Sequence, residues 1–339
     1  MPKFGLTLEQ EGMNFEIIRS LAATGEELHY DSVWLGDHFF YSEQPFLECW
    51  TTLSALACAT KRIRLGTQVL CNCYRHPPLV AKMAATLDVI SGGRLILGLG
   101  AGWHKREYVA YGIPFRRDGI RVSRLEEAVE IIGKMWTQPI TTFTGKHYEV
   151  KDARCEPKPI QKPHPPIWIG GNGNRILSIV ARHADGCNVT FGKKKIYTTG
   201  DFKERMRILE AHCSRIGKDI TDIERALSIT LILGRNEGEI KKELRRAVSH
   251  FTSKPGLSLR RRISFAYHNP ALALSTVMAM LGLVKPPFVI AGTPEQCVEK
   301  IQEFVDAGVT YFTVSFPPAL RHDVVGPSLF ADEVMPQIS

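Results

Sequence analysis

The sequence predicts a (β/α)8 TIM barrel, a fold of the α/β class. Three observations carry this prediction: strand-like apolar runs alternate with helical segments over most of the chain, eight such runs occur, and 339 residues suffice for one large domain. We therefore expect a single domain over residues 1–339. A doubly wound open sheet is the alternative, because a count of strands does not show whether the sheet closes.

The first four units lie before residue 100. Strand-like runs begin near residues 4, 32, 63 and 94, and turn residues bound each of them. Helical periodicity fills the intervals from Met13 to Leu28, from Glu48 to Thr60 and from Pro78 to Ile90. Pro77 and Pro78 favour the start of the third helix, because proline is tolerated in a first helical turn.

The second half continues the alternation with two insertions. Further strands are predicted near residues 166, 186, 226 and 310, and the predicted helices cover Asp118 to Trp136, the segment up to His183, Asp201 to Arg215, Glu237 to Phe251 and Pro294 to Ala307. Alternation around Gly145 and Lys146 predicts a hairpin inside an insertion at about 140–165. Residues 253–287 fit no unit, and we expect them to form a second insertion.

The charge balance permits an anionic partner. Lys and Arg number 43 and Asp and Glu 35, which gives a net charge of +8. Because the basic residues form no stripe interleaved with aromatic residues, we expect no nucleic acid partner. The most apolar window, Ala271 to Val284, is shorter than the roughly 18 to 20 residues that span a bilayer, so we expect no membrane partner. The N-terminal residues lack the apolar core of a signal peptide, and we expect a cytoplasmic protein.

The eight cysteines do not suggest disulfides, because the chain is neither small nor marked for secretion. We expect reduced, mostly buried thiols. Cys71 and Cys73 are separated by a single residue, which is one fewer than the usual zinc-ribbon spacing, and no second cysteine pair follows. We expect no metal site.

Polar residues follow the second and third predicted strands, at the end of a barrel where catalytic residues lie. The adjacent carboxylate and imidazole of Asp37 and His38 suit proton transfer, and they equally suit a polar turn in which Asp37 bonds to local backbone. Arg75 suits binding of an anion, or only the capping and solvation of its loop. The residues alone leave these alternatives open.

Two glycine-rich turns, Gly98–Trp103 and Gly170–Asn174, follow the fourth and fifth predicted strands. Glycines at such turns let backbone amides approach a phosphate at a helix N-terminus. Neither turn is a Walker loop, and Trp103 stands where the dinucleotide fingerprint has its third glycine. Since no hydrolase motif occurs either, the sequence favours a bound, phosphorylated organic cofactor that carries the chemistry.

Nine stretches, together with a weaker match from Gly292 to Phe316, carry a family resemblance: Ser32–Phe39, Arg62–Val69, Arg75–Pro77, Met83–Arg94, Gly98–Trp103, Glu107–Tyr108, Tyr111–Gly112, Pro166–Gly171 and Ala184–Gly186. Jointly they resemble the bacterial-luciferase-like superfamily, and more closely its oxidoreductases that depend on the deazaflavin coenzyme F420. The resemblance implies a luciferase-like barrel with the cofactor ring at its mouth and the cofactor phosphate on the glycine-rich loops.

The resemblance also implies roles for individual residues. His38 aligns with the family's active-site histidine, and Asp37 is implied to touch the polar edge of the ring, so these two are the candidate catalytic residues. Gln68–Val69 falls where the family often has a cis peptide bond, not preceding proline, behind the ring. The implied cofactor-binding residues are Asp37, Thr67, Gln68, Val69, Gly100, Ala101, Gly102, Gly170, Gly171, Asn172 and Gly173.

The implied function is hydride transfer between coenzyme F420 and an organic small-molecule substrate, with His38 moving a proton. The alternatives are an FMN-dependent monooxygenase that uses reduced flavin and oxygen, and a flavin-binding protein without catalysis. Relatives of this kind are commonly homodimers, so we expect a homodimer.

The substrate is not given by the sequence. Sugar-phosphate dehydrogenases of the superfamily carry a glutamate directly after the glycine turn, where this chain has Trp103. Glu107 lies nearby, although a role on a helix surface or in loop packing suits it equally. Aromatic residues in the variable loops suggest a largely apolar ligand.

Overall fold

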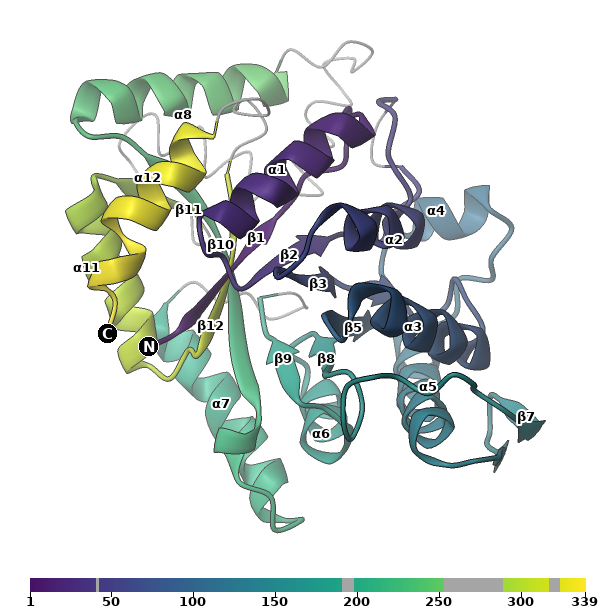
Figure 1. The fold of residues 1–339 in the computed structure, drawn as a ribbon. Coiled ribbons are helices and arrows are strands. Elements are labelled where there is room, and N and C mark those ends of the chain that lie inside the picture. The colour runs from purple at the N-terminus through teal and green to yellow at the C-terminus, as the bar shows by residue number, and fades with distance from the viewer. Residues whose placement is uncertain (41–42, 191–197, 253–288, 317–323) are drawn as a thin grey trace.

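The computed structural model describes residues 1–40, 43–190, 198–252, 289–316 and 324–339. Within these residues eight parallel strands form a closed barrel, so the TIM-barrel prediction is confirmed (Figure 1). Closure follows from the pairing of β9 with both β8 and β10. All eight predicted strands belong to the ring, which runs β1 (Lys3–Thr7), β2 (Ser32–Leu35), β3 (Arg64–Thr67), β5 (Leu95–Gly100), β8 (Ile167–Gly170), β9 (Gly186–Asn188), β10 (Glu224–Leu233) and β12 (Tyr311–Ser315).

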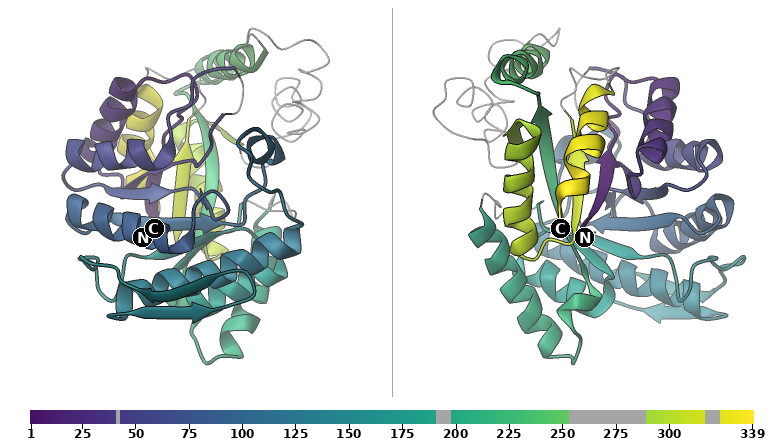
Figure 2. Two further views of the ribbon diagram at one scale, coloured as in Figure 1. Left: turned by 90° about the vertical axis from the view of Figure 1, so that its right-hand side faces the viewer. Right: turned by 60° about the vertical axis from the view of Figure 1, so that its left-hand side comes forward.

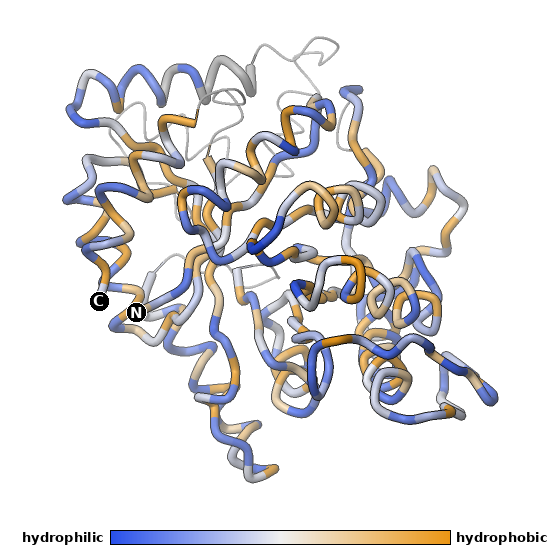
Figure 3. The backbone as a smooth tube through the Cα atoms, viewed as in Figure 1, coloured by the Kyte–Doolittle hydropathy of each residue, from blue (hydrophilic) through white to orange (hydrophobic). Residues whose placement is uncertain are grey.

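Helices surround the barrel, as the two views in Figure 2 show. The predicted helices are all present, with bounds Phe15–Glu27 (α1), Cys49–Ala59 (α2), Pro77–Ser91 (α3), Asp118–Thr137 (α5), Asn174–His183 (α6), Thr199–Ser214 (α7), Glu237–Thr252 (α8) and Pro294–Asp306 (α11). In Figure 3 these helices carry both hydrophobic and hydrophilic residues along their length, as expected for helices that bury one face against strands. The two termini lie near each other (Figure 1 and Figure 2).

The sequence did not predict some short elements. They are the two-residue β4 (Leu70–Cys71), which pairs with β5, the six-residue α4 (Lys105–Ala110), β11 (Val289–Gly292), which pairs with β10 outside the ring, α12 (Val325–Glu333) and the 3-10 turns at Ile220–Asp222 and Met335–Gln337. Two and six residues are too few to show a period. The insertion predicted at 253–287 lies outside the described residues.

The predicted hairpin in the first insertion is confirmed. Its strands, β6 (Thr141–Thr144) and β7 (Glu149–Ala153), form a two-stranded antiparallel sheet apart from the barrel. Glu127 on α5 holds the turn between them, because its carboxylate accepts hydrogen bonds from the amides of Lys146, His147 and Tyr148 at 2.9 to 3.0 Å.

A layer of mostly aromatic side chains fills the barrel interior near the N-terminal ends of the strands. It consists of Trp34, Ile96, Trp168, Ala226 and Tyr311, all at most 3% exposed. The two indole rings lie 4.9 Å apart, centroid to centroid. A Cβ on Gly66 or Gly186 would collide with one of these indoles, which explains why neighbouring strands carry glycine there. The layer closes one end of the barrel.

The cysteines agree with the prediction. All eight are free, and six of them are buried. In the described part of the chain, no helix combines the length and apolarity needed to cross a membrane.

Candidate active site

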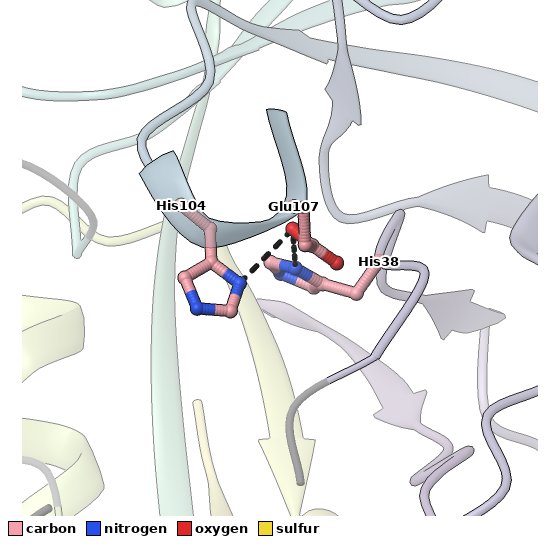
Figure 4. A group of neighbouring side chains, drawn as sticks. All are labelled: His38, His104 and Glu107. Carbon is pink, nitrogen blue, oxygen red and sulfur yellow. Dashed lines mark hydrogen bonds and ion pairs between the residues drawn. The ribbon is translucent and has the colours of Figure 1, made fainter. Parts of the chain in front are cut away.

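His38 lies at the mouth of the barrel, three residues beyond the end of β2, with its side chain 14% exposed. Its Nδ1 lies 2.9 Å from Oε2 of Glu107 on α4. Figure 4 shows these two residues converging with His104, whose Nδ1 lies 3.1 Å from the same carboxylate oxygen. Helix α4, which follows the glycine turn after β5, therefore places a carboxylate against the histidine that follows β2.

Glu107 is completely buried, and five donors surround its carboxylate. Oε1 accepts the backbone amides of Phe39 at 2.5 Å and Phe40 at 3.2 Å. Oε2 accepts the hydroxyl of Tyr74 at 2.8 Å and faces the two histidines. Burial pushes the pKa of Glu107 upward, but the hydrogen bonds from His104, His38 and Tyr74 outweigh it and hold this pKa well below the usual glutamate range. The lowered pKa favours the ionised form of Glu107 at neutral pH, and the buried carboxylate does not lie on an exposed helix surface.

Asp37 points away from His38. Its side chain is buried and forms a two-pronged ion pair with Arg75, at 2.9 and 3.0 Å, and it accepts the backbone amide of Cys71 at 2.8 Å. Arg75 also bonds to Glu48 at 2.5 Å. Burial raises the pKa of Asp37, and the guanidinium partly offsets that rise. Asp37 thus ties the loop after β2 to the loop after β4, and Arg75 does more than solvate its loop.

The peptide bond between Gln68 and Val69 is cis, as the resemblance implied. The Val69 side chain fills space left by glycines of both turns. A Cβ on Gly100 would lie 2.6 Å from Cγ2 of Val69, and a Cβ on Gly170 would lie 3.0 Å from both of its methyl groups. Packing of Val69 therefore requires these glycines, whether or not a phosphate lies near them.

The other predicted cofactor-binding residues surround this point. Thr67 is buried and exchanges two hydrogen bonds with the backbone of Gly98, at 2.7 and 2.9 Å. Gly102 has φ +76°, and a Cβ there would strike the hydroxyl of Tyr108, while Ala101 beside it is half-buried. Gly171 has φ +135°, buried Asn172 donates to the carbonyl of Val189 at 2.9 Å, and Gly173 caps α6 with open space where a Cβ would stand.

Aromatic rings flank His38. The rings of Trp103 and Phe46 meet it edge-on, with centroids at 5.9 and 6.2 Å. Trp103 also stacks on His104 at 4.9 Å and is 59% exposed. The histidine thus sits between a charged partner on one side and apolar rings on the others.

His38, His104 and Glu107 have ligand atoms within 4.8 Å of one another, and among the described residues they form the group suited to a metal ion. Hydrogen bonding to one carboxylate already accounts for how they converge. The absence of a metal stays a prediction.

Comparison with known proteins places the chain in a family. The model of the luciferase-like monooxygenase family matches residues 1–311. The chain belongs to the luciferase-like monooxygenase family. A relative in this family, the F420-dependent glucose-6-phosphate dehydrogenase of Amycolatopsis mediterranei (strain U-32), is 26% identical over 345 residues, which cover 100% of this chain and 99% of the relative.

Two solved structures of similar shape extend the comparison. The coenzyme F420-dependent tetrahydromethanopterin reductase of Methanopyrus kandleri matches with a TM-score of 0.77 and 24% identity, over 100% of this chain and 99% of that one. An F420-dependent secondary alcohol dehydrogenase, solved with an F420-acetone adduct, matches with a TM-score of 0.79 and 20% identity over the same shares. These likenesses show a shared fold.

Sequence reasoning missed most of the environment of His38. It left the role of Glu107 open, and it did not single out His104 or Tyr74. One available signal was that Glu107 follows His104 by three residues, a spacing that brings side chains together on a helix.

Proposed function

We propose that this protein is an F420-dependent oxidoreductase that transfers a hydride between the deazaflavin and an organic substrate. The observation that carries the proposal is the pairing of His38 with the buried carboxylate of Glu107 at the mouth of a luciferase-like barrel. Relatives named as F420-dependent dehydrogenases support the choice of cofactor over FMN.

We propose that the barrel mouth holds the flat ring of the cofactor. Val69 and the glycines around it give the floor an apolar half, and a hydrogen-bonded group that includes Gln68 and Ser228 gives it a polar half. A deazaflavin is apolar at one end and carries carbonyl groups at the other. We propose that the backbone and side chains of Thr67, Gln68 and Val69 support the ring, and that the two glycine turns hold the phosphate-bearing chain.

The bound deazaflavin supplies a carbon that accepts or returns a hydride. His38 handles the accompanying proton. Because its Nδ1 faces Glu107, proton exchange with a ligand falls to Nε2. When an alcohol is oxidised, a hydride leaves its carbon and the hydroxyl proton passes to Nε2, while the ionised Glu107 stabilises the imidazolium that forms. In this scheme Asp37 is a positioning residue that fixes the loop carrying His38.

We further propose that the substrate presents an apolar face beside its reacting carbon. Trp103 and Phe46 flank His38, and the exposed Trp103 has no charge to bind a sugar phosphate. Glucose-6-phosphate, the substrate in the relatives' name, and a simple secondary alcohol are therefore the two probes to compare.

The test measures F420 reduction by each probe in wild type and in His38→Ala, with His147→Ala on the β6–β7 hairpin as the control. We expect His38→Ala to lower turnover by about 10²- to 10⁴-fold and to leave the dissociation constant for F420 nearly unchanged. Normal turnover in His38→Ala would remove its assigned role. Tight binding of FMN with no binding of F420 would favour the monooxygenase alternative. Light scattering tests the expected homodimer.

A further inference from the structure

A network of hydroxyl and amide side chains lies in the barrel interior above the aromatic layer. We call it the polar floor; it consists of Thr7, Gln68, Asn188, Thr190, Ser228 and Thr313. Gln68 reaches across the interior, and its amide contacts the hydroxyls of Ser228 at 2.6 Å and Thr313 at 2.8 Å. The network thus connects residues that are far apart in the sequence.

The contacts determine where the protons lie. The Gln68 amide gives its two protons to Ser228 and Thr313, and its oxygen accepts from Thr7 at 3.0 Å. Asn188 donates to Ser228 at 2.8 Å, so both lone pairs of the Ser228 oxygen are taken. The 2.6 Å contact between Ser228 and Thr313 therefore uses the Ser228 proton. Reversing the Gln68 amide would leave only the two hydroxyl protons of Ser228 and Thr313 for three contacts, those of Gln68 with each hydroxyl and that between the hydroxyls.

Two hydroxyl protons remain. Thr313 accepts from Gln68 and Ser228, and more distantly from Asn188 at 3.5 Å, and no hydrogen bond in the described part of the chain uses its own proton. The Thr190 oxygen accepts the amide of Ser228 at 2.6 Å, and its proton is likewise unused among the described residues. These residues are 1% and 8% exposed. A buried donor without an acceptor is costly, so such groups mark a place where another molecule completes the network.

The polar floor adjoins the place where a ring is proposed to lie. Gln68 is bonded to Val69, whose side chain packs against Gly100 and Gly170. The spare groups are neutral donors, which suit a carbonyl oxygen and disfavour a cation or an apolar group. We propose that Thr313 and Thr190 donate hydrogen bonds to a carbonyl oxygen on the polar edge of the cofactor ring. This inference rests on the proposed function, and it gives the polar edge to these threonines, because the carboxylate of Asp37 is already bound.

The experiment titrates the purified protein with oxidised F420 and follows the cofactor's fluorescence. We expect Thr313→Val, which has nearly the same shape, to weaken binding by at least about five- to tenfold, because it removes the proposed donor and also the acceptor of Gln68 and Ser228. Thr190→Val has a similar expected effect. Thr313→Ser keeps the hydroxyl and should bind within about twofold of wild type. The control is Thr141→Val at the base of the hairpin, outside the barrel, where a buried hydroxyl has no hydrogen-bond partner among the described residues.

Two results overturn the inference: Thr313→Val binds F420 as wild type does, or Thr313→Ser loses as much affinity as Thr313→Val, which would indicate packing. The same variants are titrated with FMN, whose ring carries the same carbonyl groups. A wild type that binds FMN and not F420 contradicts the proposed function, and the FMN series then decides the role of the polar floor. Binding of neither cofactor contradicts both.

Discussion

Replacement of Glu107 by glutamine tests the centre of the site with almost no change in shape. The wild-type carboxylate accepts at both oxygens, whereas a glutamine accepts at one and donates at the other. Two backbone amides hold Oε1, so the new NH2 group falls where His38 and Tyr74 approach Oε2. A donor there reverses the tautomer of His38, because Nδ1 must now accept and the proton moves to Nε2.

The magnitude follows from the five donors around the carboxylate. At Oε1 the hydrogen bonds from the two backbone amides lose their charge assistance. At the former Oε2, Tyr74 and the two histidines must rearrange around the new NH2 group. We expect the free energy of unfolding to fall by about 2–4 kcal/mol. Turnover should fall by about 10²- to 10⁴-fold, since Nε2 can no longer accept the substrate's proton.

The pH dependence of stability has a definite sign. The pKa of Glu107 in the folded protein lies below the ordinary glutamate value of 4.5. A carboxyl group with a depressed pKa stabilises the fold fully above its unfolded pKa, and the effect is lost as the pH falls toward the folded value. The difference in unfolding free energy between wild type and E107Q should therefore be constant at neutral pH and shrink below about pH 4.5.

The assay combines single-turnover reduction of F420 with denaturant unfolding at several pH values. The matched control is Glu127→Gln, which alters a carboxylate that accepts three backbone amides and contacts the hairpin. Glu127→Gln should lose stability and keep turnover. If E107Q kept turnover within a few-fold of wild type while losing stability, Glu107 would have only a structural role, and the assigned tautomer of His38 would be wrong.

Three further predictions concern packing, charge and thiols. Gly66→Ala places a Cβ against an indole of the aromatic layer and should destabilise the fold by about 1–3 kcal/mol in thermal unfolding. Gly133→Ala, in open space on α5, should stabilise the fold by about 0.5–1 kcal/mol in the same assay. Equal effects of the two substitutions would contradict the packing argument. Arg75→Met leaves the buried carboxylate of Asp37 unpaired and should cost about 3–5 kcal/mol, with a smaller cost in an Asp37→Asn background; equal costs in the two backgrounds would show that the ion pair is not responsible. In the native protein a thiol reagent should modify exposed Cys58 rapidly, and it should modify the six buried cysteines only after unfolding. Rapid modification of more than two cysteines in the native protein would contradict the burial of those six thiols.

The barrel could be predicted because its information is local. Each strand is a short apolar run and each long helix a periodic segment, and their alternation in order favours a TIM barrel. The pairing of β9 with β10 decides against the doubly wound sheet, and the alternation alone does not predict that pairing. The predictions failed for α4 and β4, which are too short to show a period. The same short α4 carries Glu107, so the element hardest to detect holds the carboxylate that faces His38.

The site could be predicted only in part. The sequence places Asp37 and His38 side by side, which suggested a pair acting together. Successive side chains of an extended segment point in opposite directions, so one meets Arg75 and the other meets Glu107. Those partners come from other loops, and nothing local in the sequence indicates that they meet.

The aromatic layer gives the protein a built-in optical reporter. The ring centroids of Trp34 and Trp168 lie 4.9 Å apart, although β3 and β5 separate their strands, β2 and β8, in the barrel. Electronic transitions of two indoles this close couple, and the coupled pair produces a circular dichroism band that isolated tryptophans lack. Because the pair exists only when the ring of strands is closed, this band should report barrel closure during refolding without any added label.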